Sequence, residues 1–535
     1  MPVLNNSAFA ERHTWEAAQV CVPSYDRATV EANTTHAPRW LHFGAGNIFR
    51  GYVARLQQEL LENGCTDTGI IAAESFDTEI IDSIYLPYDN LTLLVTLLPD
   101  GGVRREMIAS VTEALAVTRD WNRLKEVFRA PSLQMVSFTI TEKGYALTGM
   151  DGSLLPAALR DMESAPEQAR HTMGLIAALL LERFAAGKAP LALVSMDNCS
   201  HNGEKLRTSI LRMAEAWRKH GFVTDAFLTW LSDETQVSFP WSMIDKITPR
   251  PSEQVQAQLE QDGIASMAAI TTSRGTFIAP FVNAEKPEYL VVEDRFPNGR
   301  PPLEKAGVYF TDRDTVNAAE RMKVTTCLNP LHTALAVTGC LLGYTSIAAE
   351  MRDPVLKALV ERIGLTEGMP ACIHPDIIEP ADFLREVLEE RLPNPFIPDT
   401  PQRIATDTSQ KVAIRFGETV KTYLASPTLN TENLIGIPLA IAAWFRYLLG
   451  VDDQLQPMAV SSDPLLEELR TGLAGVRADD PASYAGQLQP FLRREALFGV
   501  DLCAAGLGSR IEGYFVNMLE GVDAVRRTLK KHLDK

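Results

Sequence analysis

The sequence predicts a doubly wound, mostly parallel α/β domain followed by a mostly α-helical domain. The first observation is an alternation of apolar, strand-like segments with amphipathic helical segments between residues 40 and 221, which is typical of a sheet with helices on both faces. The second is a change to helical patterning alone after residue 310. A chain of 535 residues is also longer than a single hydrophobic core ordinarily accommodates. We therefore expect two domains, over residues 1–295 and 296–535.

The strands of the first domain are expected where apolar residues run into glycine or polar residues. These segments are residues 40–46, 68–75, 90–98, 133–145, 190–198 and a last one that begins at residue 288. Amphipathic periodicity predicts helices over residues 49–64, 167–187 and 202–221. The N-terminal residues 1–39 are mixed in character, and we expect them to wrap the first domain.

The second domain is expected to contain helices joined by short connections. Apolar periodicity places them over residues 312–344, 346–364, 381–392, 408–425, 435–450, 463–474, 484–498 and 510–533. The first includes a run from Val324 to Ala349 without Asp, Glu, Lys or Arg, which is long enough to raise the question of a membrane span. Its Asn, Pro, His and Gly content, between charged helices, favours a buried helix instead.

Charge and cysteine usage limit the functional classes. The formal net charge of −17 argues against a general nucleic-acid-binding protein, because phosphate affinity depends on clustered Lys and Arg. It does not exclude a small anionic substrate, which needs only a local basic pocket. Seven scattered cysteines, no CxxC motif and a start without an apolar secretory segment indicate reduced thiols in the cytoplasm. We expect no membrane partner, and a monomer or a small homo-oligomer.

The stretch HFGAGNIFRG places a glycine turn between the first strand and the first helix. Gly44 would allow a tight turn and Gly46 the close approach of a diphosphate. Asn47, Ile48 and Phe49 would open a helix whose N–H groups and dipole attract phosphate. Phe49 stands where the usual fingerprint has its third glycine, and the alternative is a glycine turn in a domain without a nucleotide. The order of strand, turn and helix favours a Rossmann-type nucleotide site.

Acidic residues after the second strand bear on the choice of nucleotide. Glu74 or Asp77 could accept a hydrogen bond from the 2′-hydroxyl of an adenosine ribose. An acid there would repel a 2′-phosphate, so NAD is expected rather than NADP. Thr141 and Glu142, in the polar strand end TEKGY, are further candidates for contact with the cofactor.

Polar residues also follow later strands of the first domain. Asp197 and Asn198 stand in SMDNCSHNG, and Asp245 stands in FPWSMIDKITP. Because the carboxyl ends of strands line the ligand crevice of a doubly wound sheet, all three are site candidates. The alternative is turn chemistry, since Asp and Asn are common loop residues. We expect cofactor and substrate to meet in a cleft between the two domains.

Lys323, Asn329 and His332 are polar residues in or beside the uncharged run, in MKVTTCLNPLH. They are either parts of a capped core helix or a catalytic base with two polar partners. Removal of a proton from an alcohol without a metal requires a base, and a lysine serves when its pKa is lowered. A zinc site made of Cys327, His332 and His374 is an alternative, but it lacks recognisable ligand spacing.

Together these motifs resemble the polyol-specific long-chain dehydrogenase family, which includes the mannitol dehydrogenases. The resemblance extends from about Trp40 to about residue 450 and includes HFGAGNIFRG, TEKGY, SMDNCSHNG, SMIDKITP and VVEDRFPNGRPPLEKAG. It implies an NAD-binding domain and a helical domain that enclose a metal-free site. In such a site hydride passes between a secondary alcohol and nicotinamide.

The resemblance also implies a role for each polar candidate. The implied catalytic groups are Lys323 as the base, Glu320 as its proton relay, Asn198 and Asn329 as oxyanion-stabilising amides, the nearby His332, and Asp245. In RIATDTSQK, Arg403 and Lys411 correspond to two basic substrate contacts. The residue types suit the chemistry, because a developing alkoxide favours preorganised neutral donors such as amides.

The spacing from Lys323 to Asn329 departs from the family pattern. The step is six residues here, where five are usual, and six residues of a regular helix turn about 240°. The two side chains would then not share a face, and the ring of Pro330 would clash with the preceding turn. We expect either a single-turn π-bulge or a helix that restarts with Asn329 as N-cap and Pro330 at its first position.

The substrate is the least constrained part of the prediction. Residues 322–344, together with RIATDTSQKVAIRFGETV, are most similar to the mannonate oxidoreductase (fructuronate reductase) branch of the family. A hexonate carboxylate would need cationic partners, which Arg403, Lys411 and Arg415 could supply. We therefore expect NAD-dependent interconversion of a hexonate and a keto-hexuronate. The alternatives are a hexitol dehydrogenase of the mannitol 2-dehydrogenase type, an altronate/tagaturonate reductase, and a nucleotide-binding protein without turnover.

Overall fold

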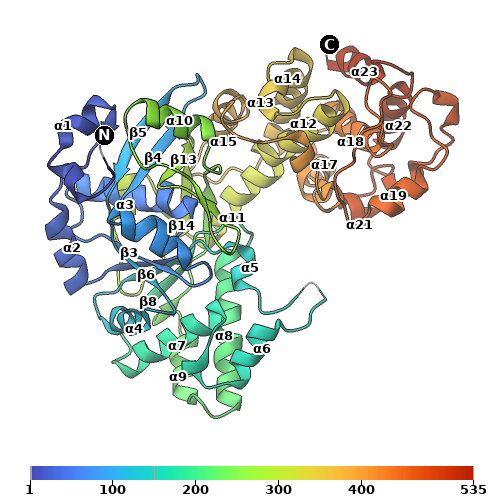
Figure 1. Cartoon of the computed structure of the whole chain (residues 1–535). Helices are drawn as coiled ribbons and strands as arrows, with labels where there is room; N and C mark the ends of the chain where they lie inside the picture. Colours follow the sequence, from blue (N-terminus) through green and yellow to red (C-terminus); the bar gives the residue numbers. More distant parts are fainter. Residues whose placement is uncertain (1–2, 150, 534–535) are drawn as a thin grey trace. The chain divides into compact units, whose positions relative to one another are not determined.

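The computed structural model describes residues 3–149 and 151–533. The chain forms two compact units, with the main division between Asn317 and Ala318 (Figure 1). The first is an α/β unit and the second is helical, as predicted. The first unit extends beyond the predicted boundary at residue 295, because strand β15 (Tyr309–Thr311) still pairs in parallel with β14 (Tyr289–Glu293).

A six-stranded, all-parallel sheet is the centre of the first unit. Its order is β6-β3-β2-β7-β8-β9, and the strands are, in that order, Val111–Ala116, Ile70–Glu74, Trp40–Phe43, Met135–Phe138, Leu191–Ser195 and Val237–Ser238. The order runs outward in one direction from β2 and in the other from β7, which is the doubly wound arrangement of dinucleotide-binding domains. The topological switch point therefore lies at the carboxyl ends of β2 and β7.

Apolar residues cover both faces of this sheet, because successive side chains of a strand point in opposite directions. Phe43 packs on the face covered by α7 (Thr172–Ala185) and α8 (Asn202–Lys219). Trp40 packs on the opposite face with residues of α3 (Ala54–Glu62). Burial of both faces explains why the strands are almost continuously apolar.

The segment predicted as the third strand, residues 90–98, forms β4 (Thr92–Leu97) in a different sheet. That sheet has the order β1-β5-β4-β13, with β1 (Val20–Cys21), β5 (Val103–Ile108) and β13 (Phe281–Glu285). The tight turn between β4 and β5 makes them an antiparallel pair, since a parallel pair needs a long crossover connection. In the main sheet, the strand that pairs with the outer side of β3 is β6, which the sequence pattern did not single out.

The strand that carries Asp245 also lies outside the main sheet. Strand β10 (Ser242–Asp245) pairs antiparallel with β14 in a three-stranded sheet of order β10-β14-β15. Pro240 stands between β9 and β10, where it has no N–H to continue a ladder. Asp245 therefore ends an antiparallel strand, in contrast to the predicted position at the carboxyl edge of the parallel sheet.

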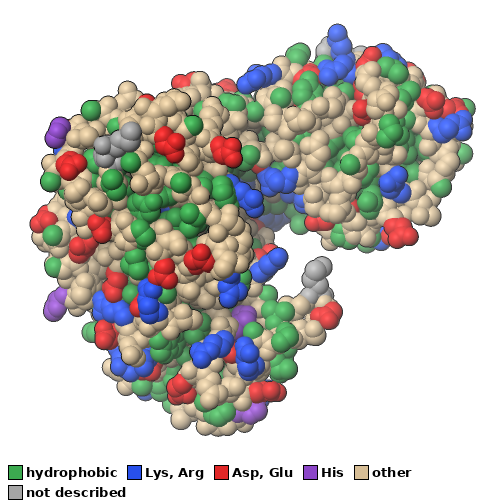
Figure 2. Space-filling view, viewed as in Figure 1, with side chains coloured by type: hydrophobic (Ala, Val, Ile, Leu, Met, Phe, Trp, Pro, Cys, Tyr) green, Lys and Arg blue, Asp and Glu red, His purple; other side chains and the backbone are tan. Residues whose placement is uncertain are grey.

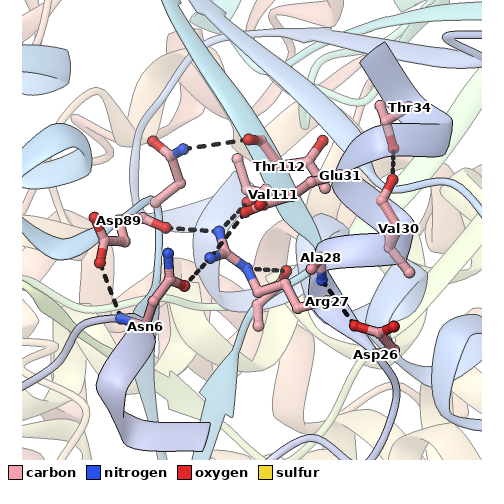
Figure 3. Close-up of polar contacts among 12 residues, drawn as sticks. Asn6, Asp26, Arg27, Ala28, Val30, Glu31, Thr34, Asp89, Val111 and Thr112 are labelled. Carbon is pink, nitrogen blue, oxygen red and sulfur yellow. Dashed lines mark hydrogen bonds and ion pairs between the residues drawn. The ribbon is translucent and has the colours of Figure 1, made fainter. Parts of the chain in front are cut away.

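The residues before β2 pack onto the first unit. At the start of α2 (Arg27–His36), the Arg27 guanidinium is buried and donates to the carbonyls of Asp89 at 2.6 Å and Val111 at 3.2 Å (Figure 3). It also bonds to the side chain of Asn6, and the Asn6 N–H donates to the Asp89 carboxylate at 2.9 Å. A buried arginine thus ties the N-terminal segment to β6 and the turn before β4.

Three helices form the centre of the second unit: α12 (Asn329–Leu341), α18 (Gly436–Tyr447) and α22 (Gly508–Asn517). Every residue of α18 is buried, and most of α12 is buried too. The uncharged run is therefore core packing, as predicted. Within the described residues, no helix has the length and apolar character needed to cross a membrane.

The remaining helices are shorter and lie around these elements. In the first unit they are α1 (Arg12–Ala17), α4 (Trp121–Arg129), α5 (Thr141–Tyr145), α6 (Pro156–Glu163), α9 (Asp225–Ser232) and α10 (Glu253–Gln261). In the second they are α13 (Ile347–Glu350), α14 (Pro354–Glu361), α15 (Pro380–Glu386), α16 (Pro401–Ile404), α17 (Glu418–Ala425), α19 (Leu466–Gly472), α20 (Gln489–Leu492), α21 (Glu495–Phe498) and α23 (Ala524–Leu533). Acidic and basic side chains are interspersed on the face that Figure 2 shows.

Candidate functional site

The glycine turn after β2 contains two glycines under different constraints. Gly44 has a φ of +107°, and a Cβ there would lie 2.2 Å from the carbonyl oxygen of Thr139. Both conformation and space therefore exclude a side chain. A Cβ on Gly46 would meet no atom within 4 Å, so the backbone at this position borders open space. A helix begins directly afterwards, with the Arg50 N–H bonded to the Gly46 carbonyl at 3.1 Å.

Phe49 supports this turn through packing. Its buried ring stacks on His42, with 4.2 Å between ring centroids. His42 is bonded to the hydroxyls of Ser137 and Thr139, and burial lowers its pKa to about 3. Any contact between Phe49 and a cofactor is therefore limited to its backbone. The stacked rings of His42 and Phe49 thus pack the helix against the strand at the position where the usual motif has its third glycine.

The first helical turn also carries a buried cation. Arg50 donates to the Ala279 carbonyl and to the Asn47 side chain, each at 2.8 Å. Burial lowers the pKa of Arg50 to about 10, so it stays protonated at neutral pH. Ile48 packs against the same core cluster as Phe49. The positive charge of Arg50 adds to the helix dipole beside the glycine turn.

Glu74, at the end of β3, connects that strand to the glycine turn. Its carboxylate accepts from the N–H groups of Ala45 at 2.9 Å, Phe76 at 2.8 Å and Asp77 at 3.2 Å. Asp77 accepts from the Thr272 hydroxyl at 2.7 Å, while its other oxygen is buried without a hydrogen-bond partner among the described residues. Of the two acids, Glu74 is the one attached directly to the turn.

Phe76 is an apolar side chain that sequence reasoning did not single out. It is 65% exposed, two residues after Glu74. The Arg274 guanidinium lies over its ring, 4.7 Å from the centroid. The available signal was an aromatic residue directly after the acidic end of a strand, in ESFD. An exposed ring at this edge offers a flat surface beside the carboxyl end of β3.

The loop after β7 is fixed by Asp197. Its carboxylate accepts from the N–H groups of Ile140 and Thr141, each at 2.9 Å, and from the Tyr145 hydroxyl at 2.5 Å. Burial raises the pKa of Asp197. Thr141 has a φ of +64°, which this pair of bonds stabilises. The side chain of Glu142, a predicted cofactor contact, is exposed and pairs with Lys205 of α8.

Asn202 is a second residue that sequence reasoning did not single out. Its side-chain amide donates to the carbonyls of Asp197 at 3.0 Å and Ser242 at 2.9 Å, and its oxygen accepts from the Ser242 N–H at 3.0 Å. One buried amide therefore joins the turn that carries Asn198 to the strand that carries Asp245. Asn198 is exposed in that turn and Asp245 is buried. Asn202 is the first residue of α8, and no local pattern distinguishes it from an asparagine that only starts a helix.

The segment from Lys323 to Asn329 has the distortion that its spacing predicts. Residues Met322–Cys327 form a π-helical turn, in which the Leu328 N–H bonds to the Lys323 carbonyl at 3.1 Å. Leu328 then leaves the helical region, with a φ of −126° and a ψ of −61°, and α12 restarts at Asn329 with Pro330 in its first turn. The predicted π distortion therefore occurs, and the helix also restarts, but one residue earlier than predicted: Leu328 is the N-cap, and Asn329 is the first helical residue and not the cap. Lys323 is 2% exposed, and Glu320 precedes it in the last turn of α11 (Arg313–Arg321).

His332, one turn into α12, faces a carboxylate. Its Nε2 lies 3.7 Å from an Asp399 oxygen. Burial lowers the pKa of His332 to about 4, an effect that Asp399 opposes and that Arg415, Arg391 and Arg403 reinforce. His332 is therefore neutral at neutral pH and able both to donate and to accept a hydrogen bond.

The predicted substrate-binding cations, Arg403, Lys411 and Arg415, all lie in the second unit. Arg403 is an exposed residue that pairs with Asp399. Lys411 bonds to the Thr406 carbonyl, and burial lowers its pKa. Arg415 donates to the Thr333 hydroxyl at 2.6 Å, and burial lowers its pKa to about 10. Arg403 and Arg415 thus act on His332, and Lys411 in turn lies near both arginines.

Sequence comparisons place both units in one family. Residues 38–305 match the mannitol dehydrogenase Rossmann domain, and residues 315–506 match the mannitol dehydrogenase C-terminal domain. A D-mannonate oxidoreductase from Thermotoga maritima is 54% identical, in an alignment that covers 99% of this chain and 98% of the relative's chain. A mannitol 2-dehydrogenase from Cereibacter sphaeroides is 31% identical over 81% of this chain and 84% of its own.

Solved structures agree with this assignment. The mannitol 2-dehydrogenase of Pseudomonas fluorescens, in a ternary complex with NAD and D-mannitol, is 27% identical with a TM-score of 0.70, covering 100% of both chains. A substrate-free D-sorbitol dehydrogenase is 25% identical with a TM-score of 0.78, covering 96% of this chain and 98% of its own. The chain belongs to the mannitol dehydrogenase family.

Proposed function

We propose that the chain is an NAD-dependent oxidoreductase that interconverts D-mannonate and D-fructuronate. The observation that carries this proposal is the 54% identity with a D-mannonate oxidoreductase over nearly the full length of both chains. The cations around His332 add support, because a hexonate brings a carboxylate that a hexitol lacks.

The glycine turn would hold the cofactor. The backbone at Gly46 borders open space, and the N–H groups of Asn47 and Ile48 at the helix start suit a diphosphate. Glu74 would accept a hydrogen bond from the adenosine ribose, and Phe76 would offer its exposed ring to the adenine. NAD, when bound, supplies the acceptor or donor of the hydride.

Lys323 would act as the general base on the substrate hydroxyl. Its side chain is 2% exposed, and burial favours the neutral amine that can accept a proton. Asn198 and Asn329 would donate to the developing alkoxide, since neutral amides stabilise it without competing for its proton. Glu320, one turn before Lys323, would pass the released proton to water.

The remaining polar residues would hold the substrate. Neutral His332, oriented by Asp399, would bond to a substrate hydroxyl, and buried Asp245 would fix the geometry of the catalytic groups. Lys411 and Arg415 would receive the carboxylate. Arg403 would join them by exchanging its Asp399 partner for the substrate, a substitution of one carboxylate for another.

A matched pair of NADH-oxidation assays, with D-fructuronate and with D-fructose, tests the proposal. We expect turnover of fructuronate, loss of that turnover in Lys323→Ala, and much slower turnover of fructose. Turnover of fructose alone would contradict the sugar-acid assignment and favour the hexitol alternative, which the 31% identity with a mannitol 2-dehydrogenase supports. Preference for D-tagaturonate would instead indicate the altronate type.

We further expect the enzyme to act in the cytoplasm as a monomer or a small homo-oligomer. All seven cysteines carry free thiols, which suits a reducing compartment. Sedimentation velocity of the purified protein would measure the oligomeric state directly.

A further inference from the structure

Two cysteine thiols meet beside the π turn. Cys327 is the last residue of that turn, and Cys372 follows the short 3₁₀ turn Met369–Ala371. The two thiols lie close enough for each to shift the pKa of the other, and the Thr326 hydroxyl also lowers the pKa of Cys372. The Cys372 thiol donates to the Ile373 carbonyl at 3.5 Å. The two segments are in tight contact, since a Cβ on Gly368 would lie 3.0 Å from the Thr326 methyl.

The two thiols differ in exposure and in surroundings. Cys327 is buried, and its thiol bonds to the Pro380 carbonyl at 3.8 Å. Cys372 is half-buried. The neighbouring Cys327 thiol lowers the pKa of Cys372, and so do the Thr326 hydroxyl and His374, whereas burial and Glu379 raise it. His374 lies between the carboxylates of Asp376 and Glu379, each at 3.2 Å. A partly exposed thiol with a lowered pKa next to a buried thiol is the pattern of an attacking and a resolving cysteine.

We propose that Cys327 and Cys372 are a reversible oxidation site at which a hydroperoxide forms a disulfide that arrests turnover. The Cys372 thiolate attacks the peroxide O–O bond, which gives a sulfenic acid and releases one water after protonation. The Cys327 sulfur then attacks the Cys372 sulfur, the S–S bond forms, and a second water leaves. Overall two thiols lose two protons and two electrons, and hydrogen peroxide is reduced to two waters.

The link reaches the proposed catalytic segment through the backbone. Disulfide formation would draw the two sulfurs to about 2 Å, which displaces the end of the π turn that separates Lys323 from Asn329. The expected arrest of turnover rests on the proposed role of Lys323, whereas the cross-link itself does not.

Treatment of the purified full-length enzyme with hydrogen peroxide tests the proposal. After alkylation of free thiols, peptide mapping should recover a Cys327–Cys372 cross-link. NADH oxidation should fall roughly tenfold or more, since small displacements of catalytic groups suffice for such losses. Dithiothreitol should reverse both changes. Cys372→Ser should form no link and keep its activity under peroxide, while Cys503→Ser, a matched change in the same unit, should respond like the wild type.

Three outcomes would overturn the proposal. They are recovery of both cysteines as free, alkylated thiols after peroxide, an unchanged rate in the cross-linked enzyme, and an equal peroxide loss in Cys372→Ser. If the reduced enzyme turns over no sugar acid, the proposed function fails by itself. Peptide mapping of the peroxide-treated wild type then still shows whether Cys327 and Cys372 form a disulfide.

Discussion

The glycine turn after β2 and the π turn Met322–Cys327 both depart from regular structure, and both carry groups of the proposed site. The glycine turn does so by omitting side chains, because at Gly44 a Cβ would lie 2.2 Å from the Thr139 carbonyl. The π turn keeps its side chains and changes their direction through the bond from the Leu328 N–H to the Lys323 carbonyl at 3.1 Å. A backbone site thus depends on glycine, whereas a side-chain site depends on helical register.

The largest effect is expected from removal of the Lys323 side chain, which lies in the π turn. Lys323→Ala should lower kcat by roughly a thousandfold, because a positioned acid–base group contributes about 10²–10⁴ to the rate. NADH binding, measured by fluorescence titration, should stay unchanged. Lys357→Ala, which removes an exposed lysine that pairs with Glu361, is the control. Substantial turnover without Lys323 would remove the basis for a side-chain site in the π turn.

Substitution of the two glycines sharpens the difference between backbone and side-chain sites. Gly44→Ala should destabilise the fold by about 2–4 kcal/mol through its positive φ and its clash with Thr139, and it should abolish NADH binding. Gly46→Ala, whose Cβ meets no atom within 4 Å, should keep its stability and lose affinity for NADH. Thermal unfolding with and without NADH measures both effects. Equal stability losses would contradict the distinct roles of the two glycines.

Glu74 in the first unit and Glu350 in the second are both buried carboxylates, and they are expected to affect the pH dependence of stability differently. Glu74 is satisfied by three backbone N–H groups, whereas burial raises the pKa of Glu350 to about 9, and neither of its oxygens has a hydrogen-bond partner among the described residues. The raised pKa means that Glu350 stabilises the fold only while protonated. That contribution is complete below its ordinary pKa and is lost as pH rises towards about 9.

The measurement for this carboxylate is the free energy of unfolding at acidic, neutral and alkaline pH. The wild type should lose stability across this range, by at most about 1.4 kcal/mol for each pH unit. Glu350→Gln should flatten the decline, while Glu74→Gln should leave it in place. Identical pH profiles for the wild type and Glu350→Gln would show that the buried acid is not protonated in the fold.

The proposed carboxylate contact makes a smaller difference that depends on the substrate. Lys411→Met should raise KM for fructuronate roughly 10–100-fold, because a hydrogen bond to a charged group contributes about 1.5–3 kcal/mol. The rate with fructose should change little. Lys421→Met, at a surface lysine that pairs with Glu418, is the matched control. An equal effect on both substrates would mean that Lys411 supports the fold and does not bind the carboxylate.

The smallest expected effect concerns the edge of the proposed cofactor site. Phe76→Ala should raise KM for NADH by about 2–10-fold, since an aromatic stacking contact contributes about 0.5–1.5 kcal/mol. The rate at saturating NADH should stay unchanged. Phe222→Ala, at another exposed ring of the same unit that stacks on His220, should leave KM unaltered. A fall in the saturated rate for Phe76→Ala would argue for a role beyond adenine stacking.

Local pattern was sufficient for much of the fold and for part of the candidate site. Strand and helix periodicity predicted the α/β unit and the helical unit, and the motif HFGAGNIFRG predicted the glycine turn. The step of six from Lys323 to Asn329 predicted the distortion seen at Cys327 and Leu328. The individual strands, helices and turns in these predictions each depend on a short stretch of chain. Backbone clashes and helical geometry act over that distance, so sequence alone carries the information.

Partnership between distant segments was decided only in the tertiary structure. Nothing local distinguishes β4, which joins a separate sheet, from β6, which completes the main one. The same holds for Asn202, whose amide links Asp197 to Ser242, and for the meeting of Cys327 with Cys372. These contacts depend on which surfaces bury one another, a property of the whole core and not of any one segment.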